Sequence, residues 1–181
     1  MYRLDVRGRK RCKLPIHDTA IQVVHTDGVR KMIPKTIHTF WLSGEEKPEQ
    51  IKACWASAKE INPSYTFRTW SVRDIRDAFP VIPAFFEEAI TYRKWAFATD
   101  WARLAVLHKF GGIYIDGDVT CHKTFDSLLD CGGFIGWESS SLLGPHTIGA
   151  KPSHPILADW VSAYTNRRFQ IADNVLDQTP M

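Results

Sequence analysis

The chain has 181 residues and a formal net charge of +3, and 44% of its residues are hydrophobic. This length predicts one small domain with a buried core, and the composition is typical of a globular protein. No apolar stretch approaches the roughly 18 residues that a membrane-spanning helix needs, and the N-terminal segment lacks the apolar core of a secretory signal. We therefore expect a protein of the bacterial cytoplasm.

Basic residues are concentrated in the first 35 residues of the chain. We expect residues 1–32 to form a basic N-terminal extension and residues 33–181 to form the functional domain. Ile21–His25 reads as a short strand, which a turn at residues 26–28 closes. Such an extension can attract anionic lipid, nucleic acid or a phosphorylated acceptor, or it can simply be solvated. We expect peripheral contact with the inner membrane through residues 1–35, and no specific nucleic acid.

The rest of the chain alternates between strand and helix patterns. Apolar residues recur at spacings of three and four from Ile51 to Ile61, which predicts a helix. Ser71 can cap a short helix, with Asp74 as its capping-box partner. Strands are predicted at residues 33–41, 65–70, 113–115, 134–137 and 147–150, and the other helices at 84–92, 95–110 and 155–167. This order predicts an α/β fold: a mixed, mostly parallel sheet flanked by helices in a small single domain.

Two aspartates follow the apolar strand 113–115, with one glycine between them. Ligands of parallel sheets bind beyond the carboxyl ends of the strands, and residues two apart in an extended segment point the same way. Asp116 and Asp118 would repel each other unless a cation lay between them. Mg²⁺ or Mn²⁺ prefers such oxygen ligands and shares itself with substrate phosphates. We favour this metal site over a turn in which the aspartates only cap nearby amides.

Other residues near this turn are candidates for ligand contacts. Asp100 and Arg103 lie three apart on the preceding helix. They either form a surface ion pair or hold the sugar hydroxyls and diphosphate of a ligand. Trp41 ends the first strand and either stacks on a base or packs in the core. His38 and Cys54 are expected in the core. The four cysteines show no zinc-like spacing and are expected to be free thiols: Cys12, Cys54, Cys121 and Cys131.

Three stretches together resemble the DXD-motif glycosyltransferase family of the sugar-binding-region type: IPKTIHTFWLSG at 33–44, ATDWARLAVLHKFGGIYIDGDV at 98–119 and GAKPSHPIL at 149–157. That family includes bacterial capsular polysaccharide transferases and yeast initiating mannosyltransferases, with clostridial glucosylating toxins as distant relatives. The middle stretch is the most specific, because Asp100, Arg103, the double glycine and the two aspartates occur in the expected order and spacing.

The resemblance implies a GT-A-like, Rossmann-type fold and a metal-dependent retaining glycosyltransferase. Such an enzyme moves a hexose from a nucleotide-diphosphate sugar, here expected to be a UDP-sugar, to a glycan or lipid-linked acceptor in polysaccharide synthesis. Mn²⁺ or Mg²⁺ is the implied cofactor. Carried over, Trp41 would stack on the base, and Asp100 and Arg103 would bind the sugar and its phosphate side. Tyr114 would line the donor pocket. Asp116 would contact the ribose and the ligand shell of the metal, and Asp118 would bind the metal directly.

One departure from the family leaves alternatives open. Relatives usually continue past a Thr-Gly-Pro element, whereas this sequence has Thr179-Pro180 near its end, so we expect a C-terminally shortened member. A non-catalytic nucleotide-sugar-binding or accessory protein is the first alternative. A metal-dependent phosphotransferase or nuclease would need further acidic ligands, for which only Asp126 and Asp130 lie nearby. A nucleic-acid-binding module would depend on the basic extension.

Overall fold

The computed structural model describes residues 3–4, 10–11, 21–23, 32–139, 141–173, 175–177 and 179. Most of the predicted basic extension, the predicted turn at residues 26–28, Cys12 and Pro180 lie outside the described residues. Two short N-terminal strands pair antiparallel, β1 (Arg3–Leu4) with β2 (Lys10–Arg11). In the described part of the chain, no helix has the length and apolar character needed to cross a membrane.

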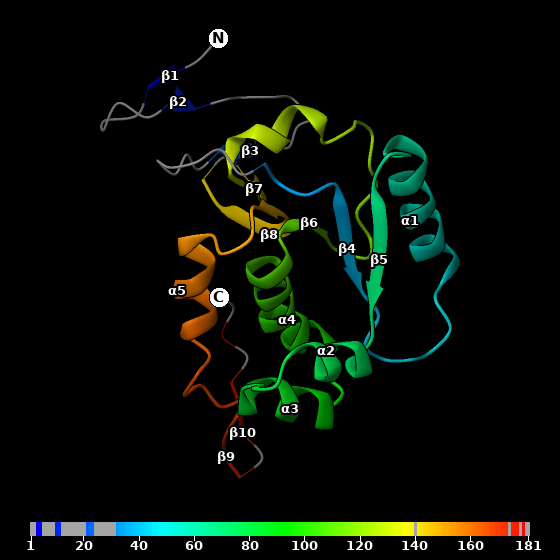
Figure 1. The fold of residues 1–181 in the computed structure, drawn as a ribbon. Helices are drawn as coiled ribbons and strands as arrows, with labels where there is room; N and C mark the ends of the chain where they lie inside the picture. Colours follow the sequence, from blue (N-terminus) through cyan, green and yellow to red (C-terminus); the bar gives the residue numbers. More distant parts are fainter. Residues whose placement is uncertain are drawn as a thin grey trace.

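Among the described residues, six strands form the main sheet in the order β3-β7-β8-β6-β4-β5 (Figure 1). Strand β4 pairs parallel with both β5 and β6, whereas the β6–β8, β8–β7 and β7–β3 pairs are antiparallel. The predicted mixed sheet is therefore confirmed, and its parallel part is β6-β4-β5. The strand bounds are β3 Ile21–Val23, β4 Thr36–Phe40, β5 Thr66–Trp70, β6 Gly112–Ile115, β7 Gly133–Trp137 and β8 Leu143–Ala150.

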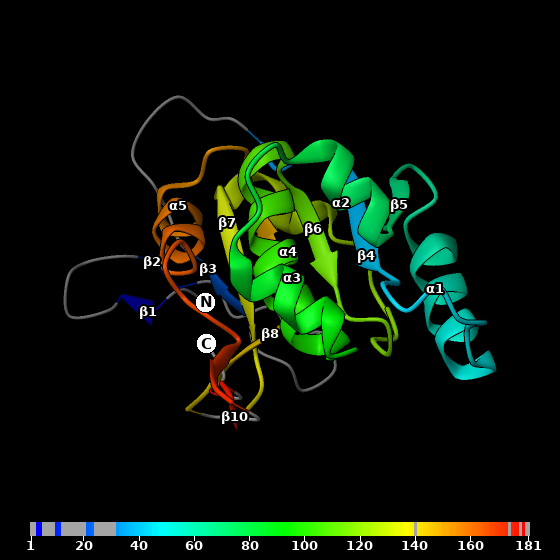
Figure 2. The same cartoon turned by 90° about the horizontal axis from the view of Figure 1, so that it is seen from below.

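Helices pack on this sheet (Figures 1 and 2), and their apolar side chains form two separate clusters with it. The larger cluster joins α2, α3, α4 and α5 to sheet residues such as Trp70 and Ile148. The smaller cluster joins α1 and a 3₁₀ turn at Asp126–Cys131 to residues such as Ile37 and Ile113. The helix bounds are α1 Glu49–Ile61, α2 Val72–Ala78, α3 Ala84–Thr91, α4 Trp95–Phe110 and α5 Pro155–Ser162.

Local sequence signals account for most element boundaries. The predicted capping box at the start of α2 is confirmed: the Ser71 hydroxyl accepts a hydrogen bond from the Asp74 amide, and the Asp74 carboxylate accepts one from the Ser71 amide. The α1 helix stops at Asn62, whose side chain donates to the carbonyl of Ala58 at 3.0 Å. The α4 helix spans the predicted residues, and its residues 101–107 are all buried.

Two predicted elements differ from the structure by four or more residues at one end, and one pair of strands was not predicted. The α5 helix ends at Ser162, short of the predicted residue 167. Strand β8 begins four residues earlier than predicted. A proline normally argues against a strand, but Pro145 lies at a register shift between β7 and β8, where a proline is tolerated. A short hairpin, β9 (Gln170–Ala172) and β10 (Val175–Leu176), was not predicted from its sequence. The division at residue 32 stays a prediction, although β3 within the expected extension pairs with β7.

The connection from α4 to β6 fixes where the aspartates lie. Gly111 and Gly112 have φ angles of 66° and 103°, which glycine adopts without steric cost. A Cβ on Gly112 would lie 2.7 Å from the carbonyl oxygen of Thr36 in β4. Trp70 Nε1 donates to His38 Nδ1 at 3.0 Å, and His38 Nε2 donates to the Gly111 carbonyl at 2.9 Å. His38 is thus a buried, hydrogen-bonded core residue, as predicted.

Candidate functional site

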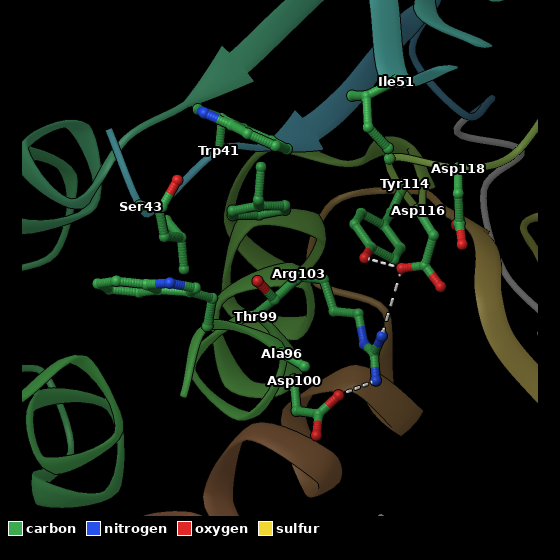
Figure 3. Close-up of a pocket in the computed structure, with 14 residues that line it drawn as sticks. Trp41, Ser43, Ile51, Ala96, Thr99, Asp100, Arg103, Tyr114, Asp116 and Asp118 are labelled. Carbon is green, nitrogen blue, oxygen red and sulfur yellow. Dashed lines mark hydrogen bonds and ion pairs between the residues drawn. The ribbon is translucent and has the colours of Figure 1, made fainter. Parts of the chain in front are cut away.

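A cavity of about 370 Å³ opens beyond the carboxyl ends of β4 and β6, beside the first half of α4 (Figure 3). Its walls come from the loop after β4, from α1, from α4 and from the turn after β6. The six residues predicted from the sequence as site residues all line it: Trp41, Asp100, Arg103, Tyr114, Asp116 and Asp118. These residues are spread over positions 41 to 118 of the sequence, and the fold brings them together around one cavity.

The turn after β6 holds the two aspartates at the cavity wall. Strand β6 is buried throughout, and the Asp116 amide continues its ladder by donating to the His146 carbonyl at 2.9 Å. Past that point the chain turns outward, so Asp116 is half-buried and Asp118 is exposed. The Asp118 carbonyl accepts a hydrogen bond from the Cys54 thiol at 3.4 Å. Figure 3 shows the side chains of both aspartates directed to the same side.

Arg103 connects the two acidic parts of the cavity. One of its terminal nitrogens donates to Asp100 Oδ1, and the other lies 3.8 Å from Asp116 Oδ1 (Figure 3). The Tyr114 hydroxyl donates to the same Asp116 oxygen. The Arg103 side chain is only 10% exposed. Of the two alternatives for Asp100 and Arg103, the exposed surface pair is therefore excluded, because this pair is enclosed and extends to the aspartate turn.

Burial governs the ionisation of this network. It raises the pKa of Asp100, with Arg103 opposing the rise and Asp116 adding to it. Burial also acts to lower the pKa of Arg103, but Tyr114, Asp100 and Asp116 outweigh it, so the pKa of Arg103 is raised. The pKa of Tyr114 is raised well above its usual value, first by burial and then by Asp116. Arg103 remains a cation, and the phenol of Tyr114 remains a hydrogen-bond donor.

Trp41 presents an aromatic ring at the cavity wall. Its Nε1 donates to the Glu45 carbonyl at 2.6 Å, and its ring lies edge-on to Trp55 with centroids 6.2 Å apart. The Lys47 ammonium lies 5.5 Å from the ring centroid. Stacking of a base on this ring stays a prediction. Trp55 and Trp101 are buried.

The carboxylate oxygens in the cavity are suitable ligands for a divalent cation that also binds a substrate. The described residues contain no group of three or more His, Cys, Asp or Glu side chains that could enclose a metal ion. Mg²⁺ typically takes one or two carboxylates and completes its shell with water and substrate phosphates. Asp116 and Asp118 match that requirement, whereas a closed structural zinc site needs four protein ligands.

The acidic residues required by the phosphotransferase alternative lie elsewhere. Asp126 Oδ1 accepts a hydrogen bond from the Tyr65 hydroxyl at 3.0 Å and pairs with Lys35 at 2.8 Å. Hydrogen bonds from Lys35 and Tyr65 lower the pKa of Asp126. Neither Asp126 nor Asp130 lines the cavity, and Asp130 is exposed. The described residues thus supply no further carboxylate cluster for that chemistry.

Sequence reasoning missed several cavity residues. Ser43, Ile51, Trp95 and Thr99 also line the cavity. Thr99 directly precedes Asp100, but consecutive residues on a helix point to different faces. Its position next to Asp100 therefore did not predict that it lines the cavity. Ile51 looked like an ordinary member of the apolar face of α1. Only the packing of α1 against the aspartate turn brings it to the cavity.

Comparison with known proteins identifies the family. Residues 15–153 match the family model described as capsular polysaccharide synthesis protein. The chain belongs to this family. It is 31% identical over 126 residues to inositol phosphoceramide mannosyltransferase 3 of Schizosaccharomyces pombe, covering 69% of this chain and 35% of that protein. It is 29% identical over 155 residues to the uncharacterized glycosyltransferase L373 of Acanthamoeba polyphaga mimivirus, covering 82% and 61%.

A further relative of this family member is mannosyl phosphorylinositol ceramide synthase CSH1 of Saccharomyces cerevisiae, 29% identical over 127 residues. That alignment covers 69% of this chain and 33% of the relative; the chain thus spans about one third of the length of these yeast proteins. Among solved structures, the PaToxG glycosyltransferase aligns with a TM-score of 0.59 and 21% identity, over 71% of this chain and 58% of that one. This likeness confirms the predicted GT-A-like fold.

Proposed function

We propose that this family member is a metal-dependent retaining glycosyltransferase that moves a hexose from a nucleotide-diphosphate sugar to a glycan or lipid-linked acceptor. The single observation that carries the proposal is the joining of Asp100, Arg103 and Asp116 in one enclosed network beside Asp118. Such a site offers carboxylates for a divalent ion and a guanidinium for a diphosphate or a sugar. The names of the relatives favour mannose among the hexoses, so the UDP-sugar expected from the sequence is tested beside GDP-mannose.

Each residue then has a distinct task toward the donor. Asp118 and Asp116 would hold Mn²⁺ or Mg²⁺, which when bound neutralises the charge on the leaving diphosphate. Trp41 would stack on the base. Asp100 would accept hydrogen bonds from sugar hydroxyls, and Arg103 would donate to the phosphate side. Tyr114 keeps Asp116 in place by donating to its carboxylate.

Retention of the anomeric configuration is proposed from the family resemblance, and the state of the cavity carboxylates bears on how it would be achieved. A covalent intermediate needs a free carboxylate as nucleophile, but Arg103 binds Asp100 and lies beside Asp116, while Asp118 is assigned to the metal. We therefore favour attack from the same face. The acceptor oxygen bonds to the anomeric carbon as the bond to the diphosphate oxygen breaks, and the acceptor proton passes to the departing phosphate.

Nucleoside diphosphate release tests this function. We would incubate the full chain with UDP-glucose, UDP-galactose and GDP-mannose, each with Mn²⁺. Release with one donor is expected, and Asp118→Asn should reduce it by about 100-fold or more, since even indirect partners of a metal affect metal affinity by 10–100-fold. Asp130→Asn is the matched control, because Asp130 is exposed and lines no part of the cavity.

The outcomes separate the candidate functions. Full metal-dependent turnover by Asp118→Asn would remove the central assignment. Tight, metal-dependent donor binding without release would instead identify a non-catalytic nucleotide-sugar binder.

We also propose that the basic residues 1–35 bring the chain to an anionic membrane surface, at the inner face of the bacterial membrane. Each Lys or Arg near such a surface contributes about 1 kcal/mol. Co-sedimentation with phosphatidylserine vesicles should exceed that with phosphatidylcholine vesicles and should fall as salt is raised. Equal binding to both vesicle types would refute this contact.

A further inference from the structure

A second cavity adjoins the proposed donor cavity on the other side of Arg103. It has a volume of about 220 Å³ and lies between α4, α5 and strands β7 and β8. Asp100 and Arg103 line both cavities, so these two side chains form part of the wall between them. The remaining walls are apolar apart from Tyr164, and include Leu143, Ile148 and Trp160.

This second cavity continues into a third along the same face of the sheet. The third has a volume of about 160 Å³ and is lined mostly by apolar residues of β7, β8 and α5, with His154, directly before α5, as its polar side chain. The two cavities share four lining residues: Ile135, Leu143, Ile148 and Trp160. They are adjoining parts of one groove, here called the α5 groove, which begins at Asp100 and Arg103 and becomes mostly apolar with distance from them.

Two buried polar atoms at the start of the α5 groove have no hydrogen-bond partner among the described residues. They are the Tyr164 hydroxyl oxygen and Arg103 Nε. Tyr164 is fully buried, and its pKa is raised to about 12, by burial first and then by Asp100. Buried polar groups are normally paired, because an unpaired one forfeits its hydrogen bonds with water. A ligand with hydroxyl groups at this end would supply the missing partners.

We propose that the α5 groove binds the acceptor, and that this acceptor is an amphiphile with a hydroxylated head and a hydrocarbon chain. The head pairs with Tyr164 and Arg103, next to the donor cavity, and the chain lies against Leu143, Ile148 and Trp160. This assignment rests on the proposed transfer function. A free glycan fits less well, because His154 is the only polar side chain that its hydroxyls could pair with among the residues that line the third cavity.

Direct binding of alkyl glucosides tests the groove without any donor. Methyl and octyl β-D-glucoside would be titrated into the full chain by calorimetry, below the critical micelle concentration. Octyl glucoside should bind more tightly, by about fourfold for each methylene that enters the groove. Equal affinity for the two glucosides would overturn the proposal.

A matched pair of leucines on the groove rim provides the control. Leu143 is 44% exposed and lines both parts of the groove, whereas Leu142 is 61% exposed and lines neither. Because both are at the surface, each glutamate variant should fold. Leu143→Glu should reduce the affinity for octyl glucoside to that for methyl glucoside, and Leu142→Glu should not. Equal effects of the two variants would mean that the chain binds elsewhere, and would also overturn the proposal.

Tyr164→Phe tests the polar end. The variant should reduce the affinity for both glucosides by up to about tenfold, the effect of one hydrogen bond. The ratio between the two affinities should stay the same. Unchanged affinity for both would refute the placement of the head. These readouts need no turnover, so a chain that releases no nucleoside diphosphate but shows this binding pattern would contradict the transferase and not the amphiphile site.

Discussion

Arg103 is the residue whose removal should disturb both stability and function. It is the buried cation between Asp100 and Asp116, so Arg103→Leu leaves uncompensated carboxylates. We expect a loss of about 3 kcal/mol in the free energy of unfolding at pH 7.5, measured by urea denaturation. Arg76→Leu is the control: the Arg76–Glu87 pair is exposed and should cost less than about 1 kcal/mol.

The loss in Arg103→Leu should also depend on pH. The pKa of Asp100 is already raised by burial, and without the opposing guanidinium it rises further. A folded pKa above the unfolded one favours the folded state at low pH, so the cost should shrink as pH falls toward 5. An equal loss in the free energy of unfolding at pH 7.5 and at pH 5 would show that the buried charge is not the cause of the loss.

His38 makes the stability of the wild-type chain depend on pH. Burial lowers the pKa of His38 from 6.5 to about 4, so between these values the unfolded chain binds more protons. The contribution of neutral His38 to the free energy of unfolding should be complete above pH 6.5. It should decrease by about 3 kcal/mol as the pH falls to 4. Urea midpoints across this window should vary less in His38→Gln than in the wild type. His122→Gln, at an exposed position, should keep the wild-type dependence.

At the scale of the element, strand β6 depends on the glycine at its start. Gly112 has a φ of 103°, and an added Cβ would lie 2.7 Å from a β4 carbonyl. Gly112→Ala should cost about 3 kcal/mol or more, from backbone strain and overpacking together. Gly44→Ala shares the positive φ, 73°, but meets nothing within 4 Å, so about 1 kcal/mol is expected. Thermal denaturation compares them, and equal losses would exclude the packing effect.

Elements with strong local signals were predictable, and those held by partners were not. The helix at residues 95–110 and the Ser71 cap follow from periodicity and capping chemistry. Strand β8 and the β9–β10 hairpin depend on neighbouring strands for their hydrogen bonds. Proline and polar residues within such strands weaken the sequence pattern from which a strand is predicted.

At the scale of the whole molecule, donor binding should stabilise the fold. A ligand that binds only the folded chain contributes about 2.7 kcal/mol at 100 times its dissociation constant, which for this size raises Tm by about 5–10 °C. We expect this shift by calorimetry with the donor selected above and Mn²⁺. EDTA, or the Asp118→Asn variant, should abolish it. A shift that survives metal removal would show that the cation is not needed for donor binding.

The sequence by itself determined the fold class, the family resemblance and the six candidate site residues, because these depend on periodicity, on motif order and on side-chain chemistry along the chain. Only the tertiary structure decided that Arg103 joins Asp100 to Asp116, that Ile51 and Trp95 reach the cavity, and that an apolar groove with unpaired polar atoms continues beneath α5. The physical reason is that burial and pairing arise between segments far apart in the chain, so they exist only once the helices have packed on the sheet.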